Sequence, residues 1–169
     1  MRRSAFPRHR RLAGFSLVEL SVVLLIISLL SALALPGYRK IQLSARSAAV
    51  ENDIRVFAGA FQNYAHDRGD WPVDGAAPGE IPEGMANYLA RTTWQQPTPI
   101  GGAYSWAPNT LQQGERYRAA LMIEAVEGKP VSADLNQLVE IDRRLDDGNL
   151  DTGNFRLGFR NQPVFVIEH

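Results

Sequence analysis

The sequence of 169 residues contains no cysteine. This absence excludes a disulfide framework, a thiolate metal site and a cysteine nucleophile. The chain also has no net charge, because 18 basic side chains balance 18 acidic ones, so nucleic acid is not an expected partner. Hydrophobic residues nevertheless make up 45% and charged residues 21%, which is the composition of a folded chain.

The sequence offers no recognisable catalytic constellation. Its three histidines, His9, His66 and His169, are far apart, and no serine lies in a glycine-elbow context. No phosphate-binding glycine loop and no dinucleotide fingerprint is found. We therefore expect a protein that is not an enzyme.

The charges are unevenly distributed along the chain. Residues 1–14 contain five arginines and no acid, a charge of +5, and the remaining 155 residues carry −5. Two segments with different fates are implied, and we assign residues 1–14 as a basic leader peptide.

A long apolar run follows the arginines. Residues 15–35 contain one ionisable side chain, Glu19, among apolar residues and serines. As a helix these 21 residues would span about 31 Å, close to the hydrocarbon thickness of a bilayer. The arginines would hold the N-terminal end in the cytoplasm and send everything after Leu35 outward.

Two kinds of export signal fit this run. One is an ordinary signal peptide, cleaved near Ala34 in the small-x-small pattern Ala32-Leu33-Ala34, which would leave an exported periplasmic binding or interaction protein. The other starts from Glu19, since a carboxylate in hydrocarbon costs about 2.5–3.5 kcal/mol and should have a partner. Cleavage before Phe15 would create an amine four residues away, or on a neighbouring copy.

The segment Gly14-Phe15-Ser-Leu-Val-Glu19-Leu20, with Pro36 after the apolar run, resembles the class III signal of type IV prepilins and type II secretion pseudopilins. The resemblance implies cleavage between Gly14 and Phe15 by the membrane-embedded prepilin peptidase, and methylation of the new N-terminus to N-methyl-Phe15. It also implies that Glu19 guides assembly by its charge. The proline of the family that loosens the helix corresponds to Pro36.

The pattern beyond the apolar run indicates a second, amphipathic part of the same helix. Pro36-Gly37 should bend or locally melt the helix, because proline removes a donor and glycine lowers helical stability. Helical spacing of apolar residues then resumes over 37–67. The domains expected are the leader 1–14, a transmembrane and assembly helix 15–36, and a periplasmic head 37–169.

The head should be of the α+β class, with the long N-terminal helix packed on a small C-terminal antiparallel sheet, as in pilins. The residues Tyr64, Gly69 and Trp71-Pro72 resemble the helix exit of major pseudopilins. The remaining elements are expected at 82–90 (helix), 103–107 and 117–125 (strands joined through 109–116), 133–145 (helix with Ser132 as N-cap), and 155–159 and 164–167 (strands).

One loop carries a candidate metal site. Asp147, Asn149 and Asp151 alternate as do the first ligands of oxygen-rich calcium loops, although the glycine and the bidentate glutamate of an EF-hand are not in place. The alternative is a tight turn rich in Asp, Asn and Gly. The resemblance to pseudopilins, which often bind calcium in a C-terminal loop, supports the calcium hypothesis.

Together these observations predict a structural fibre subunit of a type IV pilus or a type II secretion pseudopilus. Before assembly it would be a single-pass inner-membrane protein, and afterwards part of a periplasmic or surface fibre. The expected partners are further copies or other pilin-like subunits, prepilin peptidase, and the assembly platform with its ATPase. The helix-exit pattern and the lack of a disulfide-bounded loop favour the pseudopilus.

Overall fold

The computed structural model describes residues 14–169. The predicted leader, apart from Gly14, and His9 lie outside the described residues. The chain divides into two units, with the boundary between Lys40 and Ile41. The first contains the apolar part of the long helix, and the second contains the rest of that helix and every other element.

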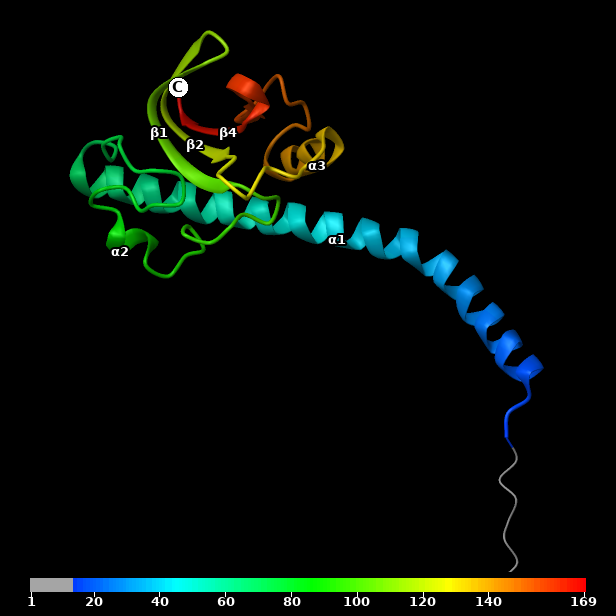
Figure 1. Ribbon diagram of the computed structural model, residues 1–169. Coiled ribbons are helices and arrows are strands. Elements are labelled where there is room, and N and C mark those ends of the chain that lie inside the picture. Colours follow the sequence, from blue (N-terminus) through cyan, green and yellow to red (C-terminus); the bar gives the residue numbers. More distant parts are fainter. Residues whose placement is uncertain (1–13) are drawn as a thin grey trace, which may run out of the picture. The chain divides into compact units, whose positions relative to one another are not determined.

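The long helix α1 runs from Leu17 to Arg68 without interruption (Figure 1). The expected local melting at Pro36 and Gly37 is therefore absent, because both residues are helical. A proline removes one backbone donor, and the hydrogen bonds of the flanking turns suffice to continue so long a helix. The helix ends at Gly69, whose φ of 79° is left-handed.

The head contains one four-stranded antiparallel sheet with the order β1-β2-β4-β3. Its strands are β1 (Ala103–Gln112), β2 (Glu115–Glu124), β3 (Phe155–Leu157) and β4 (Pro163–Glu168). The connection between β1 and β2 is shorter than predicted, since Gln113 and Gly114, both with positive φ, form a two-residue hairpin turn. Strand β3 is also shorter than predicted, because Phe159–Asn161 forms a 3-10 turn.

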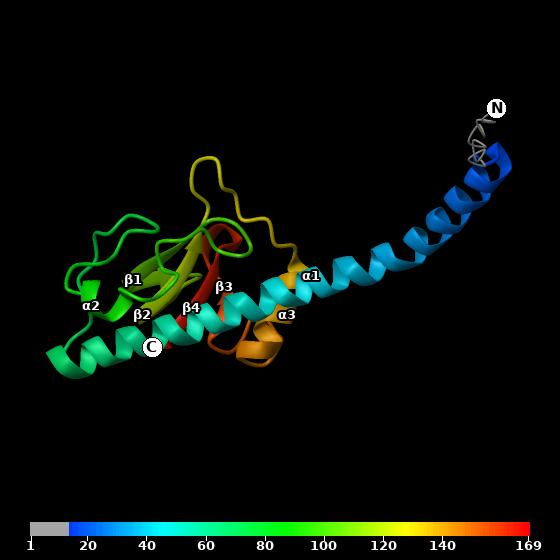
Figure 2. The same cartoon turned by 90° about the horizontal axis from the view of Figure 1, so that it is seen from below.

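The part of α1 in the head lies across the sheet (Figure 2). It buries the stripe expected from the spacing of its apolar residues, including Val50, Ile54, Phe57 and Phe61. Phe61 stacks on Trp106 of β1 with ring centroids 4.2 Å apart, and Phe57 meets Tyr104 edge-to-face at 4.7 Å. These contacts confirm a pilin-like α+β fold, in which a long N-terminal helix is packed against an antiparallel sheet.

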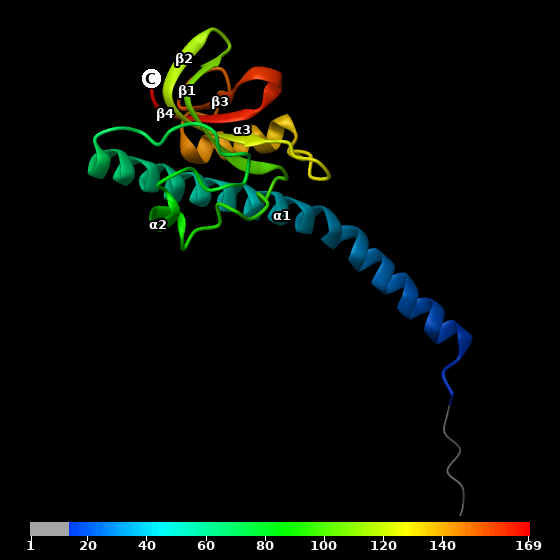
Figure 3. The same ribbon diagram turned by 60° about the vertical axis from the view of Figure 1, so that its left-hand side comes forward.

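Two short helices complete the head. Helix α2 (Ala86–Leu89) is the core of the predicted helix 82–90. Helix α3 (Leu135–Leu145) lies beside β3 (Figure 3). Its N-cap is Asp134, whose carboxylate accepts from the amide of Gln137 at 2.8 Å. The prediction of Ser132 was wrong, because that hydroxyl donates to the carbonyl of Ile100 at 2.8 Å.

Candidate assembly site

The N-terminal turn of α1 is closed by a reciprocal pair of hydrogen bonds. The backbone amide of Ser16 donates to Oε2 of Glu19 at 2.8 Å, and the amide of Glu19 donates to Oγ of Ser16 at 3.2 Å. This arrangement is a capping box, in which residues three apart satisfy two amides that have no partner inside the helix. Glu19 therefore has a partner within its own chain.

The capping box could have been found in the sequence. Ser16 and Glu19 have the S-x-x-E spacing just before an apolar run, which is the usual sign of such a box. Glu19 therefore has a local role as a capping residue, which its charge alone does not indicate. Gly14 and Phe15 precede the helix, and both are exposed.

The first unit presents an apolar surface. Every residue from Gly14 to Leu35 is exposed, including Phe15 (84%), Leu17 (83%) and Leu33 (72%). Helix α1 is long and apolar enough to cross a membrane, and none of its most apolar stretch is buried. A helix belonging to a soluble core would have that stretch covered, so this surface is suited to lipid or to other helices.

The predicted calcium loop is held by hydrogen bonds of its own. The amide of Asn149 donates to Oδ1 of Asp147 at 2.8 Å, and the amide of Asp151 donates to Oδ1 of Asn149 at 3.2 Å. The hydroxyl of Thr152 donates to the second oxygen of Asp147 at 2.6 Å. Within residues 14–169 no group of three or more His, Cys, Asp or Glu side chains is arranged to hold a metal. Calcium binding here stays a prediction.

A buried acid lies next to this loop. Asp142 of α3 is fully buried, and neither oxygen of its carboxylate has a hydrogen-bond partner among the described residues. Burial, followed by the charges of Asp147 and Asp146, raises the pKa of Asp142 to about 6. The amides of Gly148 and Asn149 are close enough to Asp142 to oppose this shift, although neither forms a hydrogen bond to its carboxylate.

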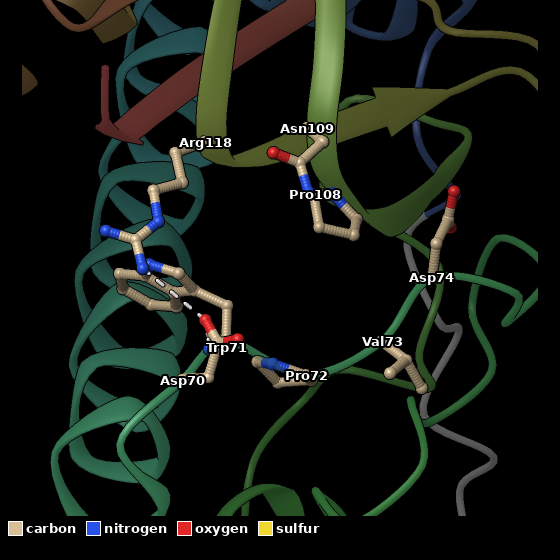
Figure 4. Close-up of a pocket in the computed structure, with 8 residues that line it drawn as sticks. All are labelled: Asp70, Trp71, Pro72, Val73, Asp74, Pro108, Asn109 and Arg118. Carbon is tan, nitrogen blue, oxygen red and sulfur yellow. Dashed lines mark hydrogen bonds and ion pairs between the residues drawn. The ribbon is translucent and has the colours of Figure 1, made fainter.

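The helix exit borders a cleft of about 470 Å³ (Figure 4). The guanidinium of Arg118, which lines the cleft, is already engaged, since it contacts Glu168 at 2.9 Å and Asp70 at 3.5 Å. The indole of Trp71 donates to the other oxygen of Glu168. Trp71, one of the residues resembling a pseudopilin helix exit, and the adjacent Asp70 therefore fasten the chain at the end of α1 to β4 and β2, which is a structural task.

Comparison with known proteins agrees with the geometry at the start of α1. Residues 9–35 match the family described as the prokaryotic N-terminal methylation motif. The chain is also similar to the fimbrial protein EcpC of Eikenella corrodens, with 39% identity over 66 residues. That match covers 39% of this chain and 43% of the relative, less than half of either.

This N-terminus and the pilin-like α+β fold resemble those of type IV pilin-like proteins. The N-terminus of the chain carries a motif of the prepilin type, and the similarity to a fimbrial protein covers less than half of the chain.

Proposed function

We propose that the chain is a subunit of a type II secretion pseudopilus or a type IV pilus-like fibre, processed after Gly14 by prepilin peptidase and methylated at Phe15. The observation that carries this proposal is the coincidence of the methylation motif over residues 9–35 with the exposed apolar surface of residues 15–35. The subunit waits as a single-pass protein of the inner membrane, with its N-terminus cytoplasmic and its head periplasmic. A platform protein and an ATPase then transfer it into the fibre.

The apolar surface explains how transfer costs little hydrophobic free energy. Side chains that face lipid before assembly face the helices of other copies afterwards, so about the same apolar area stays out of water. The fibre core would consist of segments 15–36 from successive subunits. Helical stacking of identical chains is the expected outcome of such a heterologous contact.

The charge of Glu19 sets the register of this stacking. The capping box gives its carboxylate one hydrogen bond, from the amide of Ser16, but no opposite charge. The amine of Phe15, freed by cleavage, supplies that charge from a neighbouring copy. A pair inside the apolar core is stabilised at one axial offset only, because a shift leaves both charges unpaired.

The test compares two substitutions in the same helix. Glu19→Ala should abolish or derange fibres in sheared surface material viewed by electron microscopy, while cleavage stays largely intact. Ser21→Ala is the control, since that hydroxyl only bonds the carbonyl of Val18, at 2.8 Å, within its own helix. Normal fibres or normal secretion with Glu19→Ala would contradict the charge-pairing mechanism.

We further propose that the loop of Asp147, Asn149 and Asp151 binds calcium. The support is Asp142, whose buried carboxylate next to this loop has no hydrogen bond and no cation among the described residues. A divalent ion would offset the repulsion among Asp142, Asp146 and Asp147. A pseudopilus is favoured over a pilus by the helix-exit residues and by the lack of cysteine.

A further inference from the structure

A ring of polar side chains follows directly after the apolar part of α1. Tyr38, Arg39 and Lys40 are consecutive, exposed and helical, and they lie in the same unit as the apolar surface. Successive residues of a helix point about 100° apart. The three side chains therefore surround the helix on most sides, and we call them the collar.

The collar lies one membrane thickness from Glu19. No Asp, Glu, Lys or Arg occurs between Glu19 and Arg39, and this stretch is one continuous helix. At 1.5 Å per residue the two charged residues are about 30 Å apart, which matches the hydrocarbon thickness of a bilayer. A helix inserted up to Glu19 on one side thus places the collar among the lipid headgroups of the other.

No acidic side chain among the described residues neutralises the charges of the collar. Neither Arg39 nor Lys40 forms an ion pair with another described residue, and the next acid along the chain is Glu51. Long basic side chains at the end of a span extend to the headgroups, and tyrosine favours the same layer. The chemistry that fits two such cations, about 100° apart around one helix, is the phosphate of an anionic lipid.

After cleavage, the two cations of the collar are the only uncompensated charges that flank the apolar part of α1. Once residues 1–14 are removed, the cytoplasmic flank holds only the amine of Phe15 and the carboxylate of Glu19, which cancel. The outward flank still carries Arg39 and Lys40. The mature chain would thus have its positive flank outside, the reverse of the usual bias, so the leader arginines must set the orientation before they are lost.

We propose that the collar binds anionic phospholipid headgroups on the outer side of the inner membrane and holds the waiting subunit at a fixed depth. The inference rests on the proposed membrane insertion of residues 15–36. Basic residues near an anionic surface each strengthen binding severalfold, so the two together should favour anionic over zwitterionic lipid by about 10- to 30-fold.

The test measures lipids retained by the purified full chain in native mass spectrometry. The chain is released from micelles with equal phosphatidylglycerol and phosphatidylcholine, and its five leader arginines are replaced by glutamine so that they cannot bind lipid. Arg39→Gln/Lys40→Gln is compared with Arg116→Gln/Lys129→Gln, a matched loss of two charges from the head. Phosphatidylglycerol should predominate in the parent and the control, and the preference should fall about 10-fold or more in the collar variant.

Two outcomes would overturn the proposal: the same preference in the collar variant as in the parent, or an equal loss in the control, which would reveal an effect of net charge. If the collar variant lost chain–chain association while its lipid preference stayed unchanged, the collar would bind a second copy of the chain instead of lipid. Sedimentation with phosphatidylcholine vesicles, run in parallel, shows whether the chain inserts into a membrane at all, independently of which lipid it prefers. A chain that fails to insert contradicts the proposed function, and a chain that inserts without lipid preference contradicts the collar alone.

Discussion

The hydroxyl of Tyr104, in β1, donates a hydrogen bond of 2.9 Å to the carboxylate of Asp53, in α1. The hydroxyl of Thr93 donates to the other oxygen of Asp53 at 2.8 Å. Burial, together with the charge of Asp53, raises the pKa of Tyr104, so its phenol stays a neutral donor. One carboxylate thus joins the long helix to the sheet and to the loop before it.

Removing the donor from this junction should destabilise the head. Tyr104→Phe leaves one oxygen of the half-buried Asp53 without its partner, and we expect a loss of about 1–2 kcal/mol in the free energy of unfolding. Denaturant unfolding followed by tryptophan fluorescence measures it, since Trp94 and Trp106 are buried. The control is Tyr88→Phe, whose hydroxyl bonds the exposed Asp67. Equal losses in both variants would refute the special role of Asp53.

A side chain at Gly101 should be poorly tolerated. Gly101 has a φ of 83°, and a Cβ there would collide with the carbonyl oxygen of Pro130. Gly101→Ala should lower the free energy of unfolding by more than about 2 kcal/mol. The backbone would have to move to make room for the Cβ, and alanine would also be strained in the left-handed conformation. At Gly114, with a φ of 91°, a Cβ meets nothing within 4 Å. Gly114→Ala should cost only about 1 kcal/mol, and a similar cost at both positions would contradict the clash.

The buried Asp142 should make the head less stable as the pH rises. Its pKa is raised from 3.8 to about 6, so the folded state binds the proton more tightly than the unfolded state does. The contribution of Asp142 is therefore fully present below about pH 4 and is lost as the pH rises to about 6, an effect of up to about 3 kcal/mol.

Asp142→Asn tests this linkage without changing the shape of the side chain. Denaturant unfolding between pH 4 and pH 7 should show a shallower pH dependence in this variant and greater stability at pH 7 than in the parent. The measurements are made in a chelator, which removes any contribution from metal ions. An unchanged pH profile would show that Asp142 does not titrate in this range.

Calcium should raise the melting temperature of the head. With a millimolar excess of calcium over chelator we expect a rise of several degrees, because an ion that binds only the folded state stabilises it. Asp147→Asn/Asp151→Asn should remove the rise, and Asp74→Asn, in a loop at the helix exit, should retain it. If calcium leaves the melting temperature of the unmodified chain unchanged, the loop is the tight turn that its internal hydrogen bonds already form.

Local patterns in the sequence predicted most of the fold. The apolar run and the following stripe placed the long helix at 15–67, and the structure has it at Leu17–Arg68. The local melting expected at Pro36 is absent, because the loss of one donor was weighed without the neighbouring turns that hold the helix, and a bend at this position stays a prediction. The N-cap of α3 was assigned to Ser132 instead of Asp134, because the bond from Ser132 to Ile100 depends on a contact 32 residues away.

The functional residues, too, were only partly predictable from the sequence. The sequence motif at Gly14, Phe15 and Glu19 was recognisable, and the capping box with Ser16 was present in the spacing but overlooked. The junction of Asp53 with Tyr104 joins residues 51 positions apart, and the burial of Asp142 depends on how α3 packs. Such contacts arise from tertiary packing, which a single sequence does not specify by local rules.

The most direct test is the N-terminus of the chain as isolated from cells that make it. Intact-mass measurement with N-terminal fragmentation should show a chain that begins at Phe15 and carries one methyl group on its α-amine. A chain that begins at Leu35 would identify an ordinary signal peptide instead. It would lack both Glu19 and the apolar helix, and the fibre-subunit account would then be wrong.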